Sequence, residues 1–283
     1  MNAYIVNSFT HQETGGNPAG VILLEAVYPP EEKMQEIASF LNLSETAFIV
    51  SGKGAYDFEI RFFTPTDEVP LCGHATLASI HMLSRLGKTH KKSLNIGTKA
   101  GMIKIEIKGD GTLFMKQPTP HFRLINLVER QKVEACFSIK INEEAHYPIE
   151  IWNTGLDDLI LKVKSEKDLN ALSVSFEALS QVSKQLNVVG AHVFTIENNT
   201  LYARNFAPLY GINEESATGT SNGALAAYLH HHIYPNQDLF EALVLQGVAM
   251  NHTSAIQIKS KKTQTEKSIW VGGHCHWVKT VTI

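Results

Sequence analysis

Two glycine-led turns carry the residues best suited to chemistry in this chain. Gly73 and Gly219 each stand directly before an apolar segment rich in alanine. The first turn of a helix has unpaired N–H groups and the positive end of the dipole, and a glycine lets a ligand approach the backbone. Two such turns could bind a substrate carboxylate or the enolate that forms beside it, although each could also be an ordinary turn.

Two ionisable side chains near these turns could move protons. Glu45 begins an apolar segment predicted to be a buried strand, where burial would raise the pKa of its carboxyl group toward neutrality. His74 follows Gly73 at the first turn of a predicted helix, where the dipole favours the neutral imidazole. The residues alone leave a capping or turn role open for both side chains.

Acidic residues precede both turns. Asp67 and Glu68 come before the first, and Glu214 and Glu215 come before the second. Most carboxylates in such loops are solvated. One at each turn could hold a substrate amine or position a histidine.

The cysteine and histidine spacings predict no metal site. The three cysteines, Cys72, Cys136 and Cys275, form no CxxC pair, which argues against a disulfide framework and a structural zinc site. Consecutive helical residues point about 100° apart, so the histidines at 230–232 do not readily share one ion. A Cys72–His74 nucleophile is disfavoured, because near-adjacent residues rarely give the required geometry.

The composition of the 283-residue chain excludes several classes of protein. Hydrophobic residues make up 43% and charged residues 19%, with a net charge of −3, which is ordinary for a globular protein and unlike a nucleic-acid binder. No stretch approaches the roughly 18 apolar residues of a membrane span. We expect a cytoplasmic protein with no nucleic-acid or membrane partner. The glycine-rich segments lack P-loop and dinucleotide-binding spacing, so we expect no organic cofactor.

Hydrophobic periodicity predicts alternating strands and helices. Predicted helices begin at Glu31 and cover 75–86, 127–137, 176–186 and 222–233. Predicted strands cover 6–9, 19–24, 46–50, 56–62, 103–107, 149–152, 159–163, 191–196, 201–206, 255–259 and 269–271. The helices at 75–86 and 222–233 are so apolar that we expect both to be buried.

The two halves share one pattern. The segment 61–65, Arg-Phe-Phe-Thr-Pro, leads through an acidic loop to Gly73 and a buried helix, and the segment 204–208, Arg-Asn-Phe-Ala-Pro, leads similarly to Gly219. This match indicates a duplicated unit. A boundary at Pro118–Pro120 gives an N-terminal domain over 1–117 and a similar C-terminal domain over 118–270.

Four ordered motifs resemble the PhzF-like isomerase family of phenazine biosynthesis. They lie at 16–21 (Gly-Asn-Pro-Ala-Gly-Val), 43–48 (Leu-Ser-Glu-Thr-Ala-Phe), 72–76 (Cys-Gly-His-Ala-Thr) and 217–220 (Ala-Thr-Gly-Thr). The resemblance implies the α+β diaminopimelate-epimerase-like fold, in which two similar domains each wrap a mixed β-sheet or barrel around a central α-helix. It also implies that the C-terminal strand, 271–283, joins the first domain, that the protein is a homodimer, and that no cofactor or metal is needed.

The family's functional residues carry over to matching positions. The resemblance implies that Glu45 is the acid/base that takes a proton from one carbon and returns it to another, with His74 and Glu215 as further catalytic residues. It implies that a small carboxylate-bearing substrate is bound by four further residues, Asn17, Gly73, Gly219 and Thr220.

Three positions depart from the family pattern. Glu215 stands where the family usually has Asp, Ser216 where it has Pro, and Thr220 where it has Ser. These departures put in doubt the phenazine intermediate, dihydro-hydroxyanthranilate, as the substrate. The epimerases of this fold use two opposed cysteines; here Cys72 stands at the first position but Thr218 at the second, and a hydroxyl is too weak an acid to replace a thiol.

The sequence therefore predicts a cofactor-independent isomerase. Three other functions stay open: an amino-acid epimerase or racemase with a second base, a non-catalytic small-molecule binder on the same scaffold, and a hydrolase that uses Cys72. The substrate is not determined by the motifs.

Overall fold

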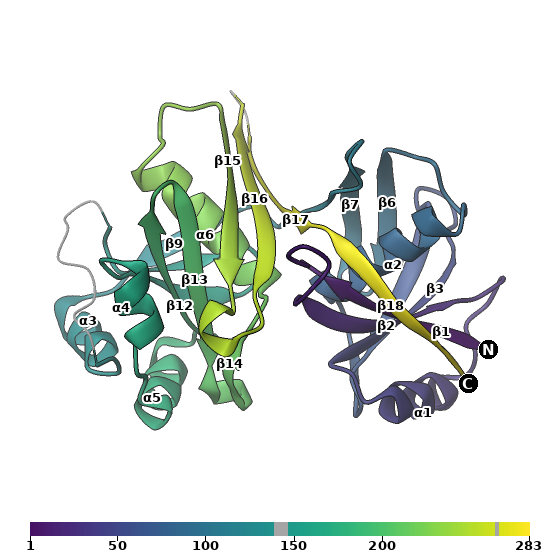
Figure 1. The fold of residues 1–283 in the computed structure, drawn as a ribbon, viewed down its shortest axis with the longest axis horizontal. Helices are drawn as coiled ribbons and strands as arrows, with labels where there is room; N and C mark the ends of the chain where they lie inside the picture. Colours follow the sequence, from purple (N-terminus) through teal and green to yellow (C-terminus); the bar gives the residue numbers. More distant parts are fainter. Residues whose placement is uncertain (139–146, 264–265) are drawn as a thin grey trace. The chain divides into compact units, whose positions relative to one another are not determined.

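The computed structural model describes residues 1–138, 147–263 and 266–283 (Figure 1). The chain divides into two compact units. Unit 1 consists of Met1–Lys116 with Gly272–Ile283, and unit 2 consists of Gln117–Val271. In the described part of the chain, no helix is long and apolar enough to span a membrane.

Unit 1 is a mixed sheet built outward from its first strand. Strand β1 (Asn2–Ser8) pairs antiparallel with both β2 (Asn17–Leu23) and the C-terminal strand β18 (Cys275–Thr282). The order continues from β2 through β3 (Glu45–Ser51), β4 (Phe58–Phe63), β6 (Ser93–Thr98), β7 (Gly101–Ile107) and β8 (Leu113–Lys116). The β2–β3 and β4–β6 pairs are parallel. Their connections contain α1 (Glu31–Leu41) and, for the second, β5 (Glu68–Val69) and α2 (Gly73–Arg85).

Helix α2 forms the centre of unit 1. It packs against β1, β2, β3, β8 and β18, and its residues from Ala75 to Ile80 are all buried. The buried hydroxyls of Thr76 and Ser79 donate hydrogen bonds to the carbonyls of Cys72 and Ala75, so they leave no unpaired group inside the helix. The predicted buried helix is confirmed.

Unit 2 repeats the same order of pairings. It runs β9 (His121–Leu124), β10 (Glu150–Asn153), β11 (Asp157–Lys162), β12 (Gly190–Glu197), β13 (Thr200–Ala207), β15 (Leu239–Gln246) and β16 (Ser254–Lys262). The β11–β12 and β13–β15 pairs are parallel. The connecting elements are α3 (Leu127–Glu134), α4 (Glu166–Ala171), α5 (Phe176–Leu186), η1 (Pro208–Tyr210), β14 (Ile212–Glu215), α6 (Gly219–His232) and η2 (Val248–Met250). Strand β17 (Lys267–Gly273) returns the chain to unit 1.

Helix α6 is the counterpart of α2. It packs against β10, β11, β12, β15 and β16, and its residues from Ser221 to His230 are buried. Each of the two helices lies in the connection between two parallel strands, β4 and β6 or β13 and β15. The duplicated pattern of the sequence thus corresponds to a duplicated topology.

The same arginine–glutamate pair recurs in both units. Arg61 binds Glu68 through two hydrogen bonds of 2.7 and 2.5 Å, and Arg204 binds Glu214 through two of 2.8 and 2.7 Å. Each guanidinium also lies over a phenylalanine of its own strand, Phe63 or Phe206. Such bidentate pairs fix geometry as well as charge. They hold the short strands β5 and β14 in place just before the two central helices, so Glu68 and Glu214 have structural partners.

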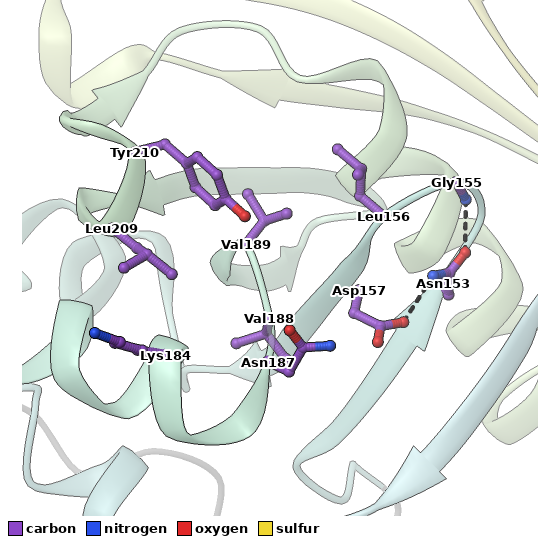
Figure 2. A pocket seen from close by; sticks show the side chains of 10 residues that line it. All are labelled: Asn153, Gly155, Leu156, Asp157, Lys184, Asn187, Val188, Val189, Leu209 and Tyr210. Atoms are coloured by element: carbon purple, nitrogen blue, oxygen red, sulfur yellow. Dashed lines mark hydrogen bonds between the residues drawn. The ribbon is translucent and has the colours of Figure 1, made fainter. Parts of the chain in front are cut away.

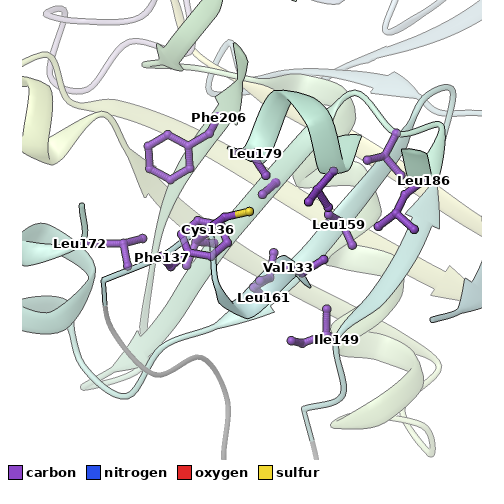
Figure 3. Packing of buried hydrophobic residues seen from close by; sticks show 14 of the residues in the cluster. Val133, Cys136, Phe137, Ile149, Leu159, Leu161, Leu172, Leu179, Leu186 and Phe206 are labelled. Atoms are coloured by element: carbon purple, nitrogen blue, oxygen red, sulfur yellow. The ribbon is translucent and has the colours of Figure 1, made fainter. Parts of the chain in front are cut away.

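A hydrophobic cluster joins the outer helices of unit 2 to its sheet. Leu179, Val182 and Leu186 of α5 and Val133 of α3 pack with residues such as Leu159 of β11 (Figure 3). A fully buried leucine contributes about 1.5–3 kcal/mol relative to an exposed one. Helix α5 spans Phe176–Leu186, as its apolar spacing predicts.

Both central helices begin earlier than hydrophobic periodicity predicts. Helix α2 begins at Gly73 rather than at residue 75, and α6 begins at Gly219 rather than at residue 222. The first residues of these helices are glycine, histidine and small polar residues, which add nothing to an apolar pattern. The extra turn matters because it places Gly73, His74, Gly219 and Thr220 within the helices' first turns.

Candidate active site

Strand β3 and helix α2 bring Glu45 and His74 together in unit 1. Glu45 is the first residue of β3 and His74 the second residue of α2. The His74 Nε2 atom lies 3.2 Å from Glu45 Oε2 and 3.3 Å from Ser44 Oγ. We call Ser44, Glu45, Cys72, Gly73 and His74 the unit 1 site. The sequence predicted catalytic roles for Glu45 and His74. It gave no role to Ser44, which directly precedes Glu45.

The Glu45 carboxylate is partly buried rather than fully buried as expected. Its side chain keeps 21% of its surface exposed. Its Oε2 atom is nevertheless shielded from solvent and accepts no aligned hydrogen bond from the described residues. A carboxylate oxygen in this state keeps a lone pair that no aligned hydrogen bond from the described residues uses, which suits a base.

Cys72 and His74 do form a close pair, which corrects the expectation that they would not. The Cys72 Sγ atom lies 3.4 Å from His74 Nδ1. Cys72 is the N-cap of α2 and has extended backbone angles (φ −140°, ψ 121°). The chain bends at this cap, so a side chain at the cap can turn back over the second helical residue, which a straight strand or helix would not allow.

Burial lowers the pKa of His74. Loss of solvation is the largest cause, and the nearby Glu45 carboxylate partly offsets it. The direction agrees with the sequence prediction of a neutral imidazole, although the prediction credited the helix dipole. A neutral His74 can donate one hydrogen bond and accept another at neutral pH.

Asn17 and Gly73 belong to the strand and the helix next to these side chains. Asn17 begins β2, and two residues later Ala19 pairs with Glu45 across the parallel β2–β3 ladder. Gly73 begins α2, and a Cβ atom added there would lie 3.2 Å from the terminal methyl group of Met115. The Met115 side chain therefore occupies the space that a side chain at Gly73 would need.

Unit 2 places a second group of predicted residues at the start of α6. Gly219 and Thr220 are its first two residues, and Thr218 is its N-cap, as Cys72 is for α2. The Thr218 hydroxyl donates a 2.5 Å hydrogen bond to Glu215 Oε2. We call Glu215, Thr218, Gly219 and Thr220 the unit 2 site.

The side-chain amide of Gln246 hydrogen-bonds to residues of the unit 2 site. Its Nε2 donates to the Glu215 carbonyl at 2.7 Å and to Thr218 Oγ1 at 3.0 Å. Its Oε1 accepts hydrogen bonds from the Thr218 N–H at 3.3 Å and from Asn222 Nδ2 at 2.7 Å. Because Thr218 Oγ1 accepts from Gln246, its own proton is directed to Glu215. The sequence missed Gln246, since a single glutamine at the end of a strand carries no motif.

Unit 2 also contains a buried acid, Asp158, and a buried histidine, His192. Asp158 is fully buried, and its Oδ2 accepts a 2.8 Å hydrogen bond from the Ser221 hydroxyl. Burial, with smaller effects of Glu215 and Asp157, raises the pKa of Asp158 to about 7. Burial likewise lowers the pKa of His192, which bonds Asn205, to about 4. Neither side chain belongs to a motif that the sequence reveals.

A separate pocket of about 290 Å³ opens elsewhere in unit 2. Three of its lining residues bond one another: Asn153 donates to Asp157 and accepts from the Gly155 N–H (Figure 2). Gly155 lies near Thr220: a Cβ atom added at Gly155 would lie 3.9 Å from the Thr220 methyl group. None of Glu215, Thr218 or Gly219 lines this pocket. The pocket therefore does not coincide with the unit 2 site.

The chain matches a known family over almost its whole length. The profile of the family described as phenazine biosynthesis-like protein matches residues 6–280. An uncharacterized isomerase of Clostridium acetobutylicum is 35% identical over 278 residues, covering 94% of this chain and 91% of the relative. Isomerase is also the enzyme class that the sequence predicts.

Solved structures share the fold. The crystal structure of a phenazine biosynthesis protein of the PhzF family from Bacillus anthracis matches with a TM-score of 0.87 at 27% identity, covering 100% of this chain and 99% of that one. A predicted epimerase from Pseudomonas aeruginosa matches with a TM-score of 0.78 at 21% identity, covering 100% and 98%. These likenesses confirm the predicted fold class.

Proposed function

Because the chain belongs to the phenazine biosynthesis-like family, we propose that it is an isomerase that moves a proton on a small carboxylate-bearing metabolite. The observation that carries this proposal is the state of Glu45 Oε2, which is buried, lies 3.2 Å from His74 Nε2 and accepts no aligned hydrogen bond from the described residues. A base needs such an available oxygen at the edge of a site.

Glu45 acts as the acid and the base in turn. Its carboxylate takes a proton from a carbon next to the substrate carboxylate, and the electron pair of that C–H bond shifts into an enolate or a neighbouring double bond. The Glu45 carboxylic acid, whose proton exchanges with solvent, then returns a proton to a different carbon. The substrate gains and loses no atoms, so the step requires no redox cofactor or group carrier.

The first turn of α2 would stabilise the negative charge that develops. The N–H groups of this first turn have no partner within the helix, so they can donate to a developing oxyanion. The neutral His74 donates a hydrogen bond to the substrate carboxylate or to Glu45, which keeps the acid and the substrate aligned. The start of α6 in unit 2, with Gly219 and Thr220, has N–H groups of the same kind. In unit 1, Asn17 contributes a side-chain amide.

A second candidate function is that of an epimerase. The observation that favours it is Glu215, a further carboxylate at a helix start, held by Thr218 at 2.5 Å. An epimerase of this kind takes a proton from one face of a carbon with one base and returns a proton to the other face from a second acid. Inversion of a single stereocentre, without a double-bond shift, would identify this reaction.

The test is hydrogen exchange in D₂O, followed by proton NMR over a panel of small amino acids, hydroxy acids and unsaturated carboxylates. We expect exchange or isomerisation of at least one compound by the wild type. Glu45→Gln keeps the shape of the side chain but removes the base, so turnover should fall by about two or more orders of magnitude.

Glu32→Gln is the matched control, because Glu32 is an exposed glutamate on α1. It should exchange hydrogen at the wild-type rate. Undiminished exchange by Glu45→Gln would refute the assignment of Glu45. Slow exchange by both variants would instead point to a general loss of structure, which circular dichroism detects.

The homodimer and the cytoplasmic location stay predictions. Sedimentation equilibrium would test the dimer, and a monomer over the working concentration range would contradict it.

A further inference from the structure

We propose that Glu45, Cys72 and His74 together bind a zinc ion, and that zinc at this place inhibits the enzyme. The three side chains each present one ligand atom, and these atoms lie within 4.8 Å of one another. All three belong to unit 1. This proposal departs from the sequence expectation of no metal site, which relied on spacing along the chain.

The distances suit a tetrahedral ion. Zinc binds sulfur at about 2.3 Å and nitrogen or oxygen at about 2.0–2.2 Å, so neighbouring ligand atoms of a tetrahedral site are about 3.3–3.6 Å apart. The His74 Nε2 atom lies 3.2 Å from Glu45 Oε2 and 3.9 Å from Cys72 Sγ. Small side-chain rotations would bring both pairs to the ideal separation.

The ligand types favour zinc over the abundant hard cations. A thiolate and an imidazole are preferred by zinc and other late transition metals, whereas Mg²⁺ and Ca²⁺ prefer oxygen ligands. The imidazole supplies its ligand atom through Nε2, which lies near both Glu45 Oε2 and Cys72 Sγ. A thiolate and a carboxylate supply two negative charges, which balance Zn²⁺ and offset the unfavourable positive end of the α2 dipole.

The site also has an available carboxylate lone pair and room for a fourth ligand, as a zinc ion requires. Glu45 Oε2 accepts no aligned hydrogen bond from the described residues, so one of its lone pairs is available. Ser44 Oγ lies 3.3 Å from His74 Nε2, near enough for a hydroxyl or a water molecule to fill a fourth position. Three protein ligands with one open position is an arrangement known for zinc.

The histidine run at the end of α6 is a weaker candidate. His230 is bound to Ser260 and to the Gln237 carbonyl, whereas His232 is bound to Glu150. The two side chains therefore have separate partners, as their helical spacing predicts. His231 is exposed and serves as a control.

Zinc would inhibit the enzyme because it would bind Glu45, the proposed base. The inhibitory role therefore rests on the proposed function. A zinc-bound Glu45 carboxylate cannot take a proton from substrate, because its available lone pair is used by the metal. Zinc binding itself does not depend on the reaction. The binding test therefore stands even if Glu45 has no catalytic role.

The experiment uses Co²⁺ as a coloured substitute for Zn²⁺ in the full-length, reduced, metal-free protein. We expect one Co²⁺ per chain, with a thiolate-to-cobalt charge-transfer band in the near ultraviolet and the intense visible bands of a tetrahedral ion. Zn²⁺ should displace Co²⁺ and remove both signals. Calorimetry with Zn²⁺ should give the same stoichiometry, and Mg²⁺ should not compete.

Three variants test the ligands. Cys72→Ser should abolish the charge-transfer band, and His74→Asn and Glu45→Gln should each weaken zinc binding by at least about tenfold, since even supporting residues of metal sites contribute that much. His231→Asn should bind as the wild type does. Circular dichroism establishes that each variant is folded.

The zinc site is refuted if no charge-transfer band forms at saturating Co²⁺, or if a band persists in Cys72→Ser. Loss of binding in His231→Asn would move the site to α6 and also refute it. If zinc binds but does not slow hydrogen exchange by the wild type, the inhibitory role is wrong. If Glu45→Gln abolishes exchange while zinc fails to bind, the proposed function stands and the zinc site falls.

Discussion

Replacing Asp158 with asparagine should stabilise the protein, and the gain should grow as the pH rises. Asp158 is fully buried on β11, where its Oδ2 accepts a hydrogen bond from Ser221. Its Oδ1 has no hydrogen-bond partner among the described residues. A charge at this place is poorly solvated, and burial raises the pKa of Asp158 from 3.8 to about 7. Asparagine resembles the protonated acid and never ionises.

The magnitude follows from the two pKa values of this side chain. Below pH 3.8 the acid is protonated in both the folded and the unfolded chain, and its titration costs no stability. Between pH 3.8 and about 7 the unfolded chain loses the proton first, so stability falls as the pH rises. The full loss is about 4 kcal/mol, at about 1.4 kcal/mol for each tenfold change in proton affinity. About 2–3 kcal/mol of it falls between pH 5 and pH 8.

The assay is urea denaturation of wild type and Asp158→Asn at pH 5 and pH 8. We expect the advantage of Asp158→Asn in the free energy of unfolding to be about 2–3 kcal/mol larger at pH 8. His192, whose pKa burial lowers to about 4, reduces stability as the pH falls below 6.5. Both proteins contain His192, so its effect cancels in the comparison.

Asp238→Asn is the matched control, because Asp238 is exposed. Its effect should be the same at both pH values, since this side chain meets water in both states. An Asp158→Asn effect that is equal at pH 5 and pH 8 would refute the reasoning. It would mean that the buried carboxyl group ionises as easily in the folded chain as in the unfolded one.

Two further substitutions test packing and positioning in unit 2. Gly223→Ala should cost about 1–3 kcal/mol of stability, because its Cβ would lie 2.7 Å from the buried Thr154 Oγ1; an unchanged urea midpoint would contradict this. Gln246→Leu removes the hydrogen bonds that hold Glu215 and Thr218. We expect Gln246→Leu to lower the rate of hydrogen exchange at saturating substrate and the free energy of unfolding by on the order of 2 kcal/mol. Exchange at the wild-type rate would show that Gln246 does not position the unit 2 site.

Residue types and motifs alone were enough to predict the family, the fold class and the residues at the two helix starts. These conclusions rest on short segments whose chemistry is local: a glycine before an apolar run, an acid at the start of a strand, and a repeated Arg-x-Phe-x-Pro pattern. Local preferences follow from neighbouring residues, so they can be read directly along the chain. Hydrophobic periodicity placed the start of α6 three residues too late, at residue 222 instead of Gly219, because glycine and small polar side chains add no periodic signal.

Tertiary structure alone decided which acids are available and what surrounds them. Glu68 and Glu214 are bound by arginines of neighbouring strands, whereas Glu45 retains an oxygen without an aligned hydrogen bond among the described residues. The sequence could not separate these acids, because their partners come from other elements.

The buried network of unit 2 depended on folding for the same reason. Asp158 meets Ser221 across 63 residues of chain, and Gln246 meets Thr218 across 28. The pKa of a side chain depends on its burial and on its partners in space. Residue type and spacing identified where chemistry could occur, but only the packed fold determined which of these groups are charged, engaged or free to react.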